Sequence, residues 1–291
     1  MPDAPGYGAL LDALRGVIWP ARVASRGATA GTHKSRLRGS SAEFTEYRAY
    51  RQGDDPRRLD WKLLARTDRA FLRITNERAT LPTLLVVDAS ASMHFPAESV
   101  AKWAQARALA VGLAGVAHAA GDPVSLAVPG APPRRLPFRA RRGVVSDVAR
   151  VLDAAAPQGD APLAPVLREQ GRAARIAIVT DLLGDAPALL RVARERVTCG
   201  VEVVLVHVVA REELEPPPGA RLAEDPEAPT VRRALVGATR DAYRAAFDAW
   251  RSEAARAWRA AGARYVEVLT DEHAERAVRR VVGAARDGID A

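Results

Sequence analysis

The sequence predicts an α/β fold, a mainly parallel sheet with helices on both faces, preceded by an N-terminal α+β extension. Short apolar runs rich in Val, Ile and Leu alternate with longer helical stretches from residue 84 onward. Strands that alternate with helices form parallel sheets, because a parallel pair needs a long crossover connection. With 291 residues, 48% of them hydrophobic, the chain can bury a sizeable core.

The individual elements follow from these runs and from the turn residues between them. Gly121-Asp122-Pro123, for example, is typical of a turn that leads from a helix into a strand. We expect strands at 84–88, 124–128, 175–180, 201–209 and 265–269, with an edge hairpin near 135–139. We expect helices at 98–120, 144–156, 163–173, 187–198, 240–261 and 272–285, and an exposed proline-rich loop at 215–229.

The first 81 residues have a different character and divide into two parts before the main domain at 82–291. Residues 1–40 predict a helix near 8–19 and then a basic loop. Residues 41–81 predict a short helix with Asp55 as N-cap and Pro56 in its first turn, then a strand, all packed on the sheet. Residues 1–80 hold 15 Lys and Arg against 9 Asp and Glu, which is +6 of the total net charge of +8.

Composition narrows the classes of function. The single cysteine, Cys199, excludes an internal disulfide framework and favours a reducing compartment. The N-terminus lacks the features of a signal peptide, and the longest apolar run, 108–120, is too short to span a bilayer. We therefore expect a cytoplasmic protein without a transmembrane segment. No nucleic-acid-binding motif accompanies the basic clusters, so nucleic acid is not the expected partner.

Acidic and hydroxyl side chains follow two of the predicted strands. Asp88, Ser90 and Ser92 come after the strand at 84–88, and Asp181 comes after the strand at 175–180. Ligands of open parallel sheets collect at the carboxyl ends of the strands, so these four residues converge on one crevice if the two strands lie close together in the sheet. Oxygen ligands of this kind suit Mg2+, and a divalent ion would relieve the repulsion between the two carboxylates. The alternative is that both aspartates only cap the helices that follow.

These residues resemble a known family. Asp88-Ala-Ser90-Ala-Ser92, with Asp181 as the later acid, resembles the metal-ion-dependent adhesion site of von Willebrand factor A-like domains, which have a Rossmann-type sheet. The run from Glu43 to Trp61 resembles the signature of the bacterial domain-of-unknown-function 58 family, and Lys102 also fits its pattern. The resemblance implies a non-enzymatic, cytoplasmic or membrane-associated binding protein that works with a MoxR-type AAA+ ATPase in complex assembly or maturation.

The sequence departs from the adhesion-site pattern at one position and leaves alternatives open. The resemblance implies a threonine ligand where Gly159-Asp160-Ala161 has Ala161, so binding of Mg2+ or another divalent cation is expected to be weakened or lost. One alternative is a metal-free scaffold that binds through its basic N-terminal face. Another is a Mg2+-dependent haloacid-dehalogenase-like phosphatase, but that chemistry needs a second acid where this chain has Ser90.

Overall fold

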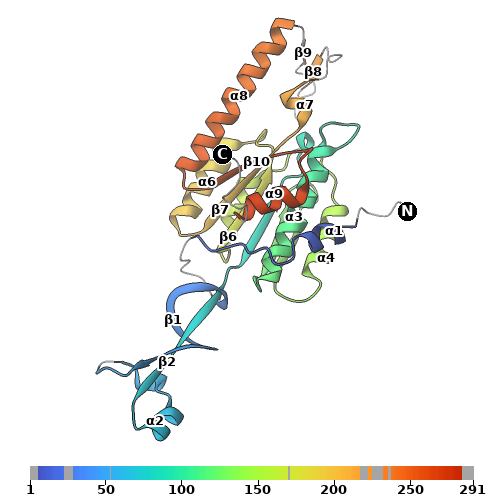
Figure 1. Cartoon of the computed structure of the whole chain (residues 1–291). Helices are drawn as coiled ribbons and strands as arrows, with labels where there is room; N and C mark the ends of the chain where they lie inside the picture. Colours follow the sequence, from blue (N-terminus) through green and yellow to red (C-terminus); the bar gives the residue numbers. More distant parts are fainter. Residues whose placement is uncertain are drawn as a thin grey trace, which may run out of the picture.

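The computed structural model describes residues 6–22, 29–52, 54–169, 171–216, 222–224, 232–234 and 237–283. It shows one central sheet with helices on both sides, and a separate ribbon that projects away from it (Figure 1). No helix in these ranges is long and apolar enough to cross a bilayer.

The central sheet has six strands in the order β10-β7-β6-β3-β4-β5. Five strands are parallel to one another and β5 is antiparallel to its neighbour β4, so the predicted mainly parallel α/β sheet is confirmed. Prolines before and within β5 fit its place at an edge of the sheet. The strands are β3 (Thr83–Val87), β4 (Val124–Val128), β5 (Arg134–Arg139), β6 (Arg175–Thr180), β7 (Glu202–Val209) and β10 (Arg264–Leu269).

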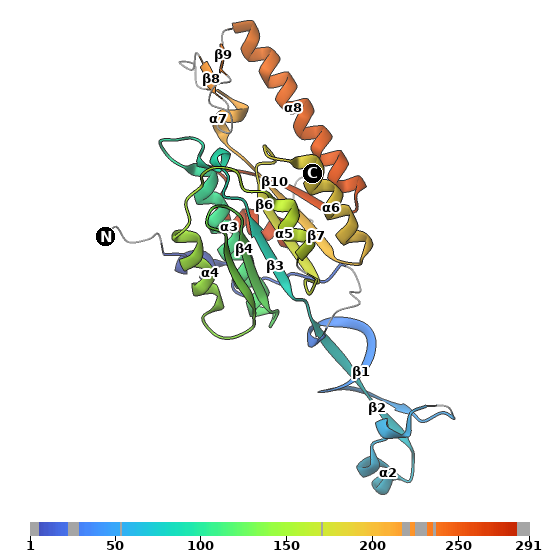
Figure 2. The same ribbon diagram turned by 180° about the vertical axis from the view of Figure 1, so that it is seen from behind.

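Two hydrophobic layers cover the sheet because successive strand residues point to opposite faces. In β3, Leu85 and Val87 pack into one layer and Leu84 and Val86 into the other. The first layer contains α1 (Gly8–Ala13), α3 (Ala101–Ala119), α4 (Val144–Asp153) and α9 (Ala274–Val282). The second contains α5 (Leu163–Glu169), α6 (Ala186–Thr198) and α8 (Gly237–Ala260), seen from behind in Figure 2.

The N-terminal helix is shorter than predicted and ends at Ala13. Gly16 follows with φ +77°, a conformation that glycine adopts without strain, and the chain then continues without helical structure. Trp19 is fully buried in this segment, and the Arg175 guanidinium lies 4.3 Å from the centre of its ring. Arg175 also donates to the carbonyl of Trp19 at 3.3 Å, so this contact holds the segment against the start of β6.

The segment before the sheet forms a two-stranded antiparallel ribbon of β1 (Thr29–Ala49) and β2 (Phe71–Thr80). Part of the predicted basic loop therefore lies in β1, and residues 23–28 lie outside the described residues. The 41–81 segment pairs partly with itself and partly with residues 29–39, and it extends away from the sheet (Figure 1), whereas the sequence favoured packing on it. Its strands satisfy their main-chain groups against each other, so the ribbon does not need the sheet as a partner.

Two short helices lie between the ribbon strands, and three further short elements of the described chain lie between β7 and α8 in the sequence. η1 (Pro56–Arg58) is a 3-10 helix, and the Asp55 carboxylate accepts a hydrogen bond from the Arg57 amide at 3.0 Å, which confirms the predicted cap. α2 (Trp61–Thr67) follows, capped by Asp60. α7 (Arg211–Leu214) comes after β7, and β8 (Leu222–Glu224) pairs with β9 (Arg232–Ala234) where an exposed loop was predicted.

Candidate functional site

The two strand-end aspartates lie side by side at one end of the sheet. β3 and β6 are adjacent and parallel, with Val87 opposite Val179, so Asp88 and Asp181 follow neighbouring strands. The Asp88 amide donates to the Val179 carbonyl at 2.9 Å, which continues the ladder past the end of β3. The fold therefore brings together the two acids that the sequence predicted to converge.

The Asp88 carboxylate is buried, and both of its oxygens accept hydrogen bonds. The Ser90 amide donates to Oδ1 at 2.9 Å, and the Thr180 hydroxyl donates to Oδ2 at 2.6 Å. Burial raises the pKa of Asp88 to about 6, and the nearby charge of Asp181 adds to the increase. Thr180 was not among the predicted site residues, although a hydroxyl beside a strand-end acid is a signal that could have identified it.

Ser90 and Ser92 present their hydroxyls to each other on the loop that continues into η2 (Ala91–His94). The two Oγ atoms are 3.0 Å apart, and Ser92 is fully buried. Two neighbouring ligands of an octahedral Mg2+, each at about 2.1 Å, also lie about 3.0 Å apart. The two hydroxyls are hydrogen-bonded to each other in the structure, and the same spacing would suit two ligands of one divalent ion.

The loop that was expected to supply a threonine ligand lies against this serine loop. The Ala91 amide donates to the Gly159 carbonyl at 2.9 Å, and the Gln158 amide donates to the Ala89 carbonyl at 2.9 Å. Ala161 is buried in the same loop, at 5% exposure, but its methyl group cannot bind a cation. The residues present thus fit an ion that keeps several of its waters.

A buried lysine lies beside the second aspartate. Lys102 in α3 has no exposed surface, and its Nζ lies 2.9 Å from Asp181 Oδ2 and 2.5 Å from Glu213 Oε1. Burial alone would lower the pKa of Lys102, but the attraction of the two carboxylates outweighs burial and raises it. The repulsion between Asp88 and Asp181, which led us to expect a divalent ion, is therefore already reduced by an ammonium group of the chain itself.

Glu213 reaches Lys102 from α7, which directly follows β7. Its Oε2 accepts a hydrogen bond from the Ala210 amide at 2.8 Å, so this side chain also closes the first turn of α7. Burial raises the pKa of Glu213. The sequence indicated Lys102 only through the family pattern and did not indicate Glu213, because 111 residues separate the two.

A histidine supports the site from β7. His207 Nε2 lies 3.1 Å from the Asp181 carbonyl oxygen, and Nδ1 lies 2.6 Å from the Tyr265 hydroxyl. Burial lowers the pKa of His207 to about 4, so the imidazole is neutral at physiological pH. His94, the histidine closest in sequence to the serine loop, is exposed.

The residue types at the site limit how a cation could be held there. Within the described ranges, no group of three or more His, Cys, Asp or Glu side chains could hold a metal ion. Any ion here would therefore depend on the Ser90 and Ser92 hydroxyls and on water. The position two residues after Asp88, where a phosphatase needs its general acid, is occupied by Ser90.

The mainly parallel sheet and the Asp-x-Ser-x-Ser loop after β3 form the arrangement that the resemblance to von Willebrand A-like domains implies. The family described as "Protein of unknown function DUF58" matches residues 46–257, and the chain belongs to this family.

Relatives and solved structures are similar over much of the chain. Rv1480 from Mycobacterium tuberculosis (strain ATCC 25618 / H37Rv) and Mb1516 from Mycobacterium bovis are each 30% identical over 269 residues, which is 89% of this chain and 84% of the relative. The conserved hypothetical protein BatB from Bacteroides thetaiotaomicron is similar in structure, with a TM-score of 0.46 and 17% identity over 70% of this chain and 98% of BatB. The SpRpn10 VWA domain gives a TM-score of 0.34 and 13% identity over 73% of this chain and 100% of that domain.

Proposed function

We propose that this chain is a non-enzymatic protein-binding module whose partner contacts the sheet end formed by Asp88, Ser90, Ser92 and Asp181. The observation that supports the proposal is the convergence of these four side chains after two adjacent strands. Ligands of open parallel sheets bind at this end. The four side chains are almost fully buried and are held by short hydrogen bonds, so they form a rigid polar cluster at this end of the sheet, which favours a specific contact.

A divalent cation, Mg2+ by preference, is the proposed cofactor of this polar cluster. Ser90 and Ser92 would hold it through their hydroxyls, while Asp88 and Asp181 would supply negative charge. When bound, the ion would offer an open position to an acidic side chain of the partner. Ala161 in place of a threonine, and the ammonium of Lys102 beside Asp181, both reduce the expected affinity.

The proposed partner is a AAA+ ATPase of the MoxR type, and the proposed process is assembly or maturation of a protein complex. The support for this partner is the family resemblance of the segment from Glu43 to Trp61 and of the Asp88–Ser92 loop. In this proposal the chain binds the partner, and ATP hydrolysis by the ATPase provides the energy for assembly or maturation of the complex.

The proposal is tested by capture of the purified MoxR-type ATPase on immobilised native chain, Asp88→Ala and Asp241→Ala. Asp241 is exposed on α8, outside the loops that form the site, so its variant removes the same charge elsewhere. We expect Asp88→Ala to lose most of the capture and Asp241→Ala to retain it. Equal capture by all three chains would contradict the proposal, as would turnover of a generic phosphate ester that Asp88→Asn abolishes.

The buried Lys102 favours a second candidate, a scaffold that binds without metal. Its Nζ already pairs with Asp181, so the site can remain folded and charge-balanced without an ion. In this version a chelator does not change capture of the ATPase, whereas added salt weakens it strongly because the basic N-terminal face supplies the contact. Of the basic side chains that would form this face, Arg22 is exposed, whereas the structure does not describe the side chains of Arg26, Lys34, Arg36 and Arg38.

A further inference from the structure

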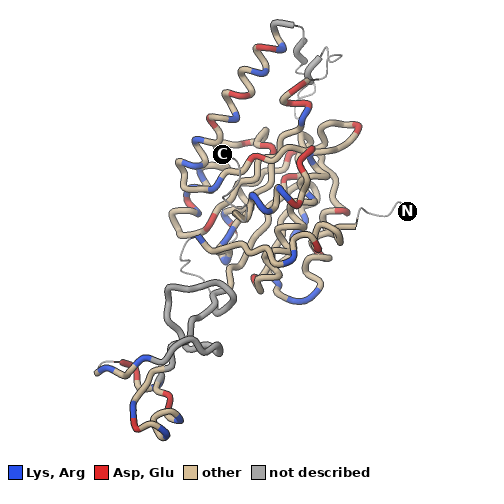
Figure 3. The backbone as a smooth tube through the Cα atoms, in the orientation of Figure 1, with Lys and Arg blue, Asp and Glu red and all other residues tan. Residues whose placement is uncertain are grey.

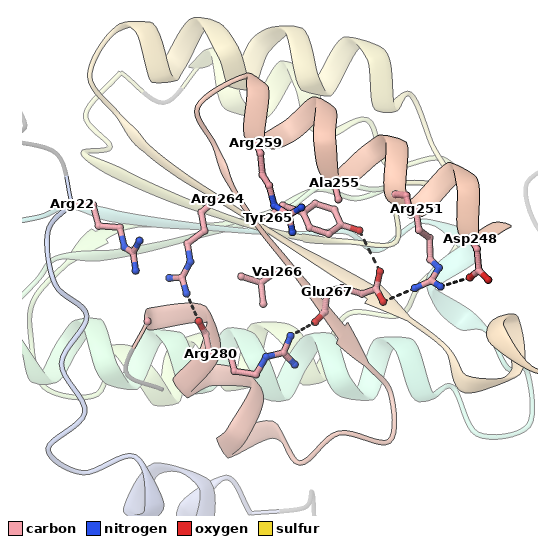
Figure 4. Close-up of a pocket in the computed structure, with 12 residues that line it drawn as sticks. Arg22, Asp248, Arg251, Ala255, Arg259, Arg264, Tyr265, Val266, Glu267 and Arg280 are labelled. Atoms are coloured by element: carbon pink, nitrogen blue, oxygen red, sulfur yellow. Dashed lines mark hydrogen bonds and ion pairs between the residues drawn. The ribbon is translucent and has the colours of Figure 1, made fainter. Parts of the chain in front are cut away.

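A second polar hollow lies at the lateral edge of the sheet, along β10 and between α8 and α9. Its volume is about 780 Å3. Figure 4 shows its side chains around β10, and Figure 3 shows Lys and Arg positions on both flanking helices. Five arginines line the hollow, which we call the basic edge groove: Arg22, Arg251, Arg259, Arg264 and Arg280.

Two of these arginines are neutralised within the protein. Arg251 pairs with Glu267 at 2.5 Å and with Asp248, which are the two acids that line the groove among the described residues. Arg280 pairs with Glu272 at 2.6 Å. These two guanidinium groups therefore contribute little net charge to the groove.

The other three arginines leave an excess of positive charge. In the described part of the chain, Arg22 and Arg259 have no carboxylate within ion-pair distance, and both are exposed. Arg259 lies over the Tyr265 ring at 5.6 Å, and Arg264 donates to the carbonyls of Arg280 and Val281 near the end of α9. Burial and the neighbouring charge of Arg22 lower the pKa of Arg264, which shows that the positive charges repel one another here.

The groove runs beside an edge strand. Among the described strands β10 pairs with β7 alone, so one side of its main chain faces the groove. The Glu267 carbonyl accepts from Arg280 at 2.7 Å on this outer side. Because main-chain groups alternate along a strand, those of Tyr265 also face outward. Edge strands with free main-chain groups bind extended peptides.

We propose that the basic edge groove binds an extended acidic segment of a partner protein. Carboxylates of that segment would neutralise Arg22, Arg259 and Arg264, and its main chain would lie along β10. Nucleic acid fits less well, because the Tyr265 ring is buried beneath Arg259 and offers no face on which a base could stack. A bilayer fits less well because the site is a hollow between two helices. This binding does not depend on Asp88 or on a metal ion.

The test is fluorescence anisotropy with a labelled octa-glutamate peptide, and with an octa-glutamine peptide as the neutral control probe. The chains are native, Arg22→Glu/Arg259→Glu, and Arg194→Glu/Arg256→Glu. The second variant reverses the same number of charges at exposed positions of α6 and α8 outside the groove. Circular dichroism of each variant checks that the fold is retained, and Asp88→Ala serves as a control for the other site.

We expect the native chain to bind octa-glutamate and not octa-glutamine, with an affinity that falls as salt rises. Arg22→Glu/Arg259→Glu should weaken binding by about tenfold or more, because both reversed charges lie at the rim of the groove. The Arg194→Glu/Arg256→Glu and Asp88→Ala chains should bind like the native chain. The proposal is overturned by absence of binding, by equal weakening in the two charge-reversed variants, or by tighter groove-dependent binding of a single-stranded oligonucleotide or phosphatidylglycerol vesicles.

Discussion

Replacing the buried lysine of the candidate site by methionine should strongly destabilise the fold. Lys102 is fully buried, and Asp181 and Glu213 would lose their only cation within 3 Å in the described structure. Removing one partner of a buried ion pair typically costs about 3–5 kcal/mol, because the remaining charge stays buried without compensation. Methionine has nearly the volume of the lysine stem, so loss of packing contributes little to this cost.

The free energy of unfolding of Lys102→Met, measured in urea, should therefore fall by about 3–5 kcal/mol, with a fall in Tm of roughly 6–20 °C. The triple variant Lys102→Met/Asp181→Asn/Glu213→Gln removes all three charges and should regain much of the loss. Lys62→Met is the matched control, because Lys62 is exposed on α2, and it should change stability by no more than about 0.5 kcal/mol.

Two results would refute this reasoning. A loss below about 1 kcal/mol in Lys102→Met would mean that the pair behaves like an exposed ion pair. A triple variant as unstable as the single variant would mean that Lys102 stabilises through packing and not through charge. The free energy of unfolding of both chains can also be measured with and without MgCl2. An ion held near Asp181 should stabilise Lys102→Met more than it stabilises the native chain.

Three further predictions concern His207, the loop that contains Ala161 and the N-terminal segment. The pKa of His207 is about 4 in the folded chain and 6.5 in the unfolded chain, so the free energy of unfolding of the native chain should fall by roughly 3 kcal/mol as pH falls from 6.5 to 4. His207→Gln should lack this loss when both chains are unfolded in urea across this pH range. Parallel curves of stability against pH for the two chains would contradict the prediction. Ala161→Thr should bind Mg2+ more tightly than the native chain by calorimetry, and equal affinity would mean that the residue at 161 does not contact the ion. Trp19→Ala should cost about 3–5 kcal/mol of stability, whereas Ile18→Ala, at a side chain that is 66% exposed, should cost under about 0.5 kcal/mol.

The sheet could be predicted because its strands are continuous apolar runs, which is what burial on both faces requires. The runs at Leu84–Val87 and Ile176–Val179 became neighbouring strands. The site could be predicted in part for the same reason, since an acid at the end of such a run must lie at the rim of the sheet. That Asp88 and Asp181 meet also required β3 and β6 to be neighbours, which the sequence did not reveal.

The lysine contact and the ribbon could not be predicted in the same way. The Lys102–Glu213 contact depends on how α3 and α7 pack, and side chains so far apart in sequence carry no local signal of it. β1 has no sustained apolar alternation that would indicate a strand of 21 residues, and it exists because β2 pairs with it. A strand stabilised by its partner is poorly specified by its own sequence.

The ribbon has a mechanical consequence for the sheet. β2 ends at Thr80 and β3 begins at Thr83, so only Leu81 and Pro82 join the projecting arm to the central strand. The Leu81 amide donates a hydrogen bond to the Asp122 carboxylate at 2.8 Å, and the Leu81 side chain is buried. This two-residue connection is therefore held firmly against the central domain. A molecule that bound the ribbon and displaced it would therefore act directly on β3, and Asp88 follows the other end of that strand.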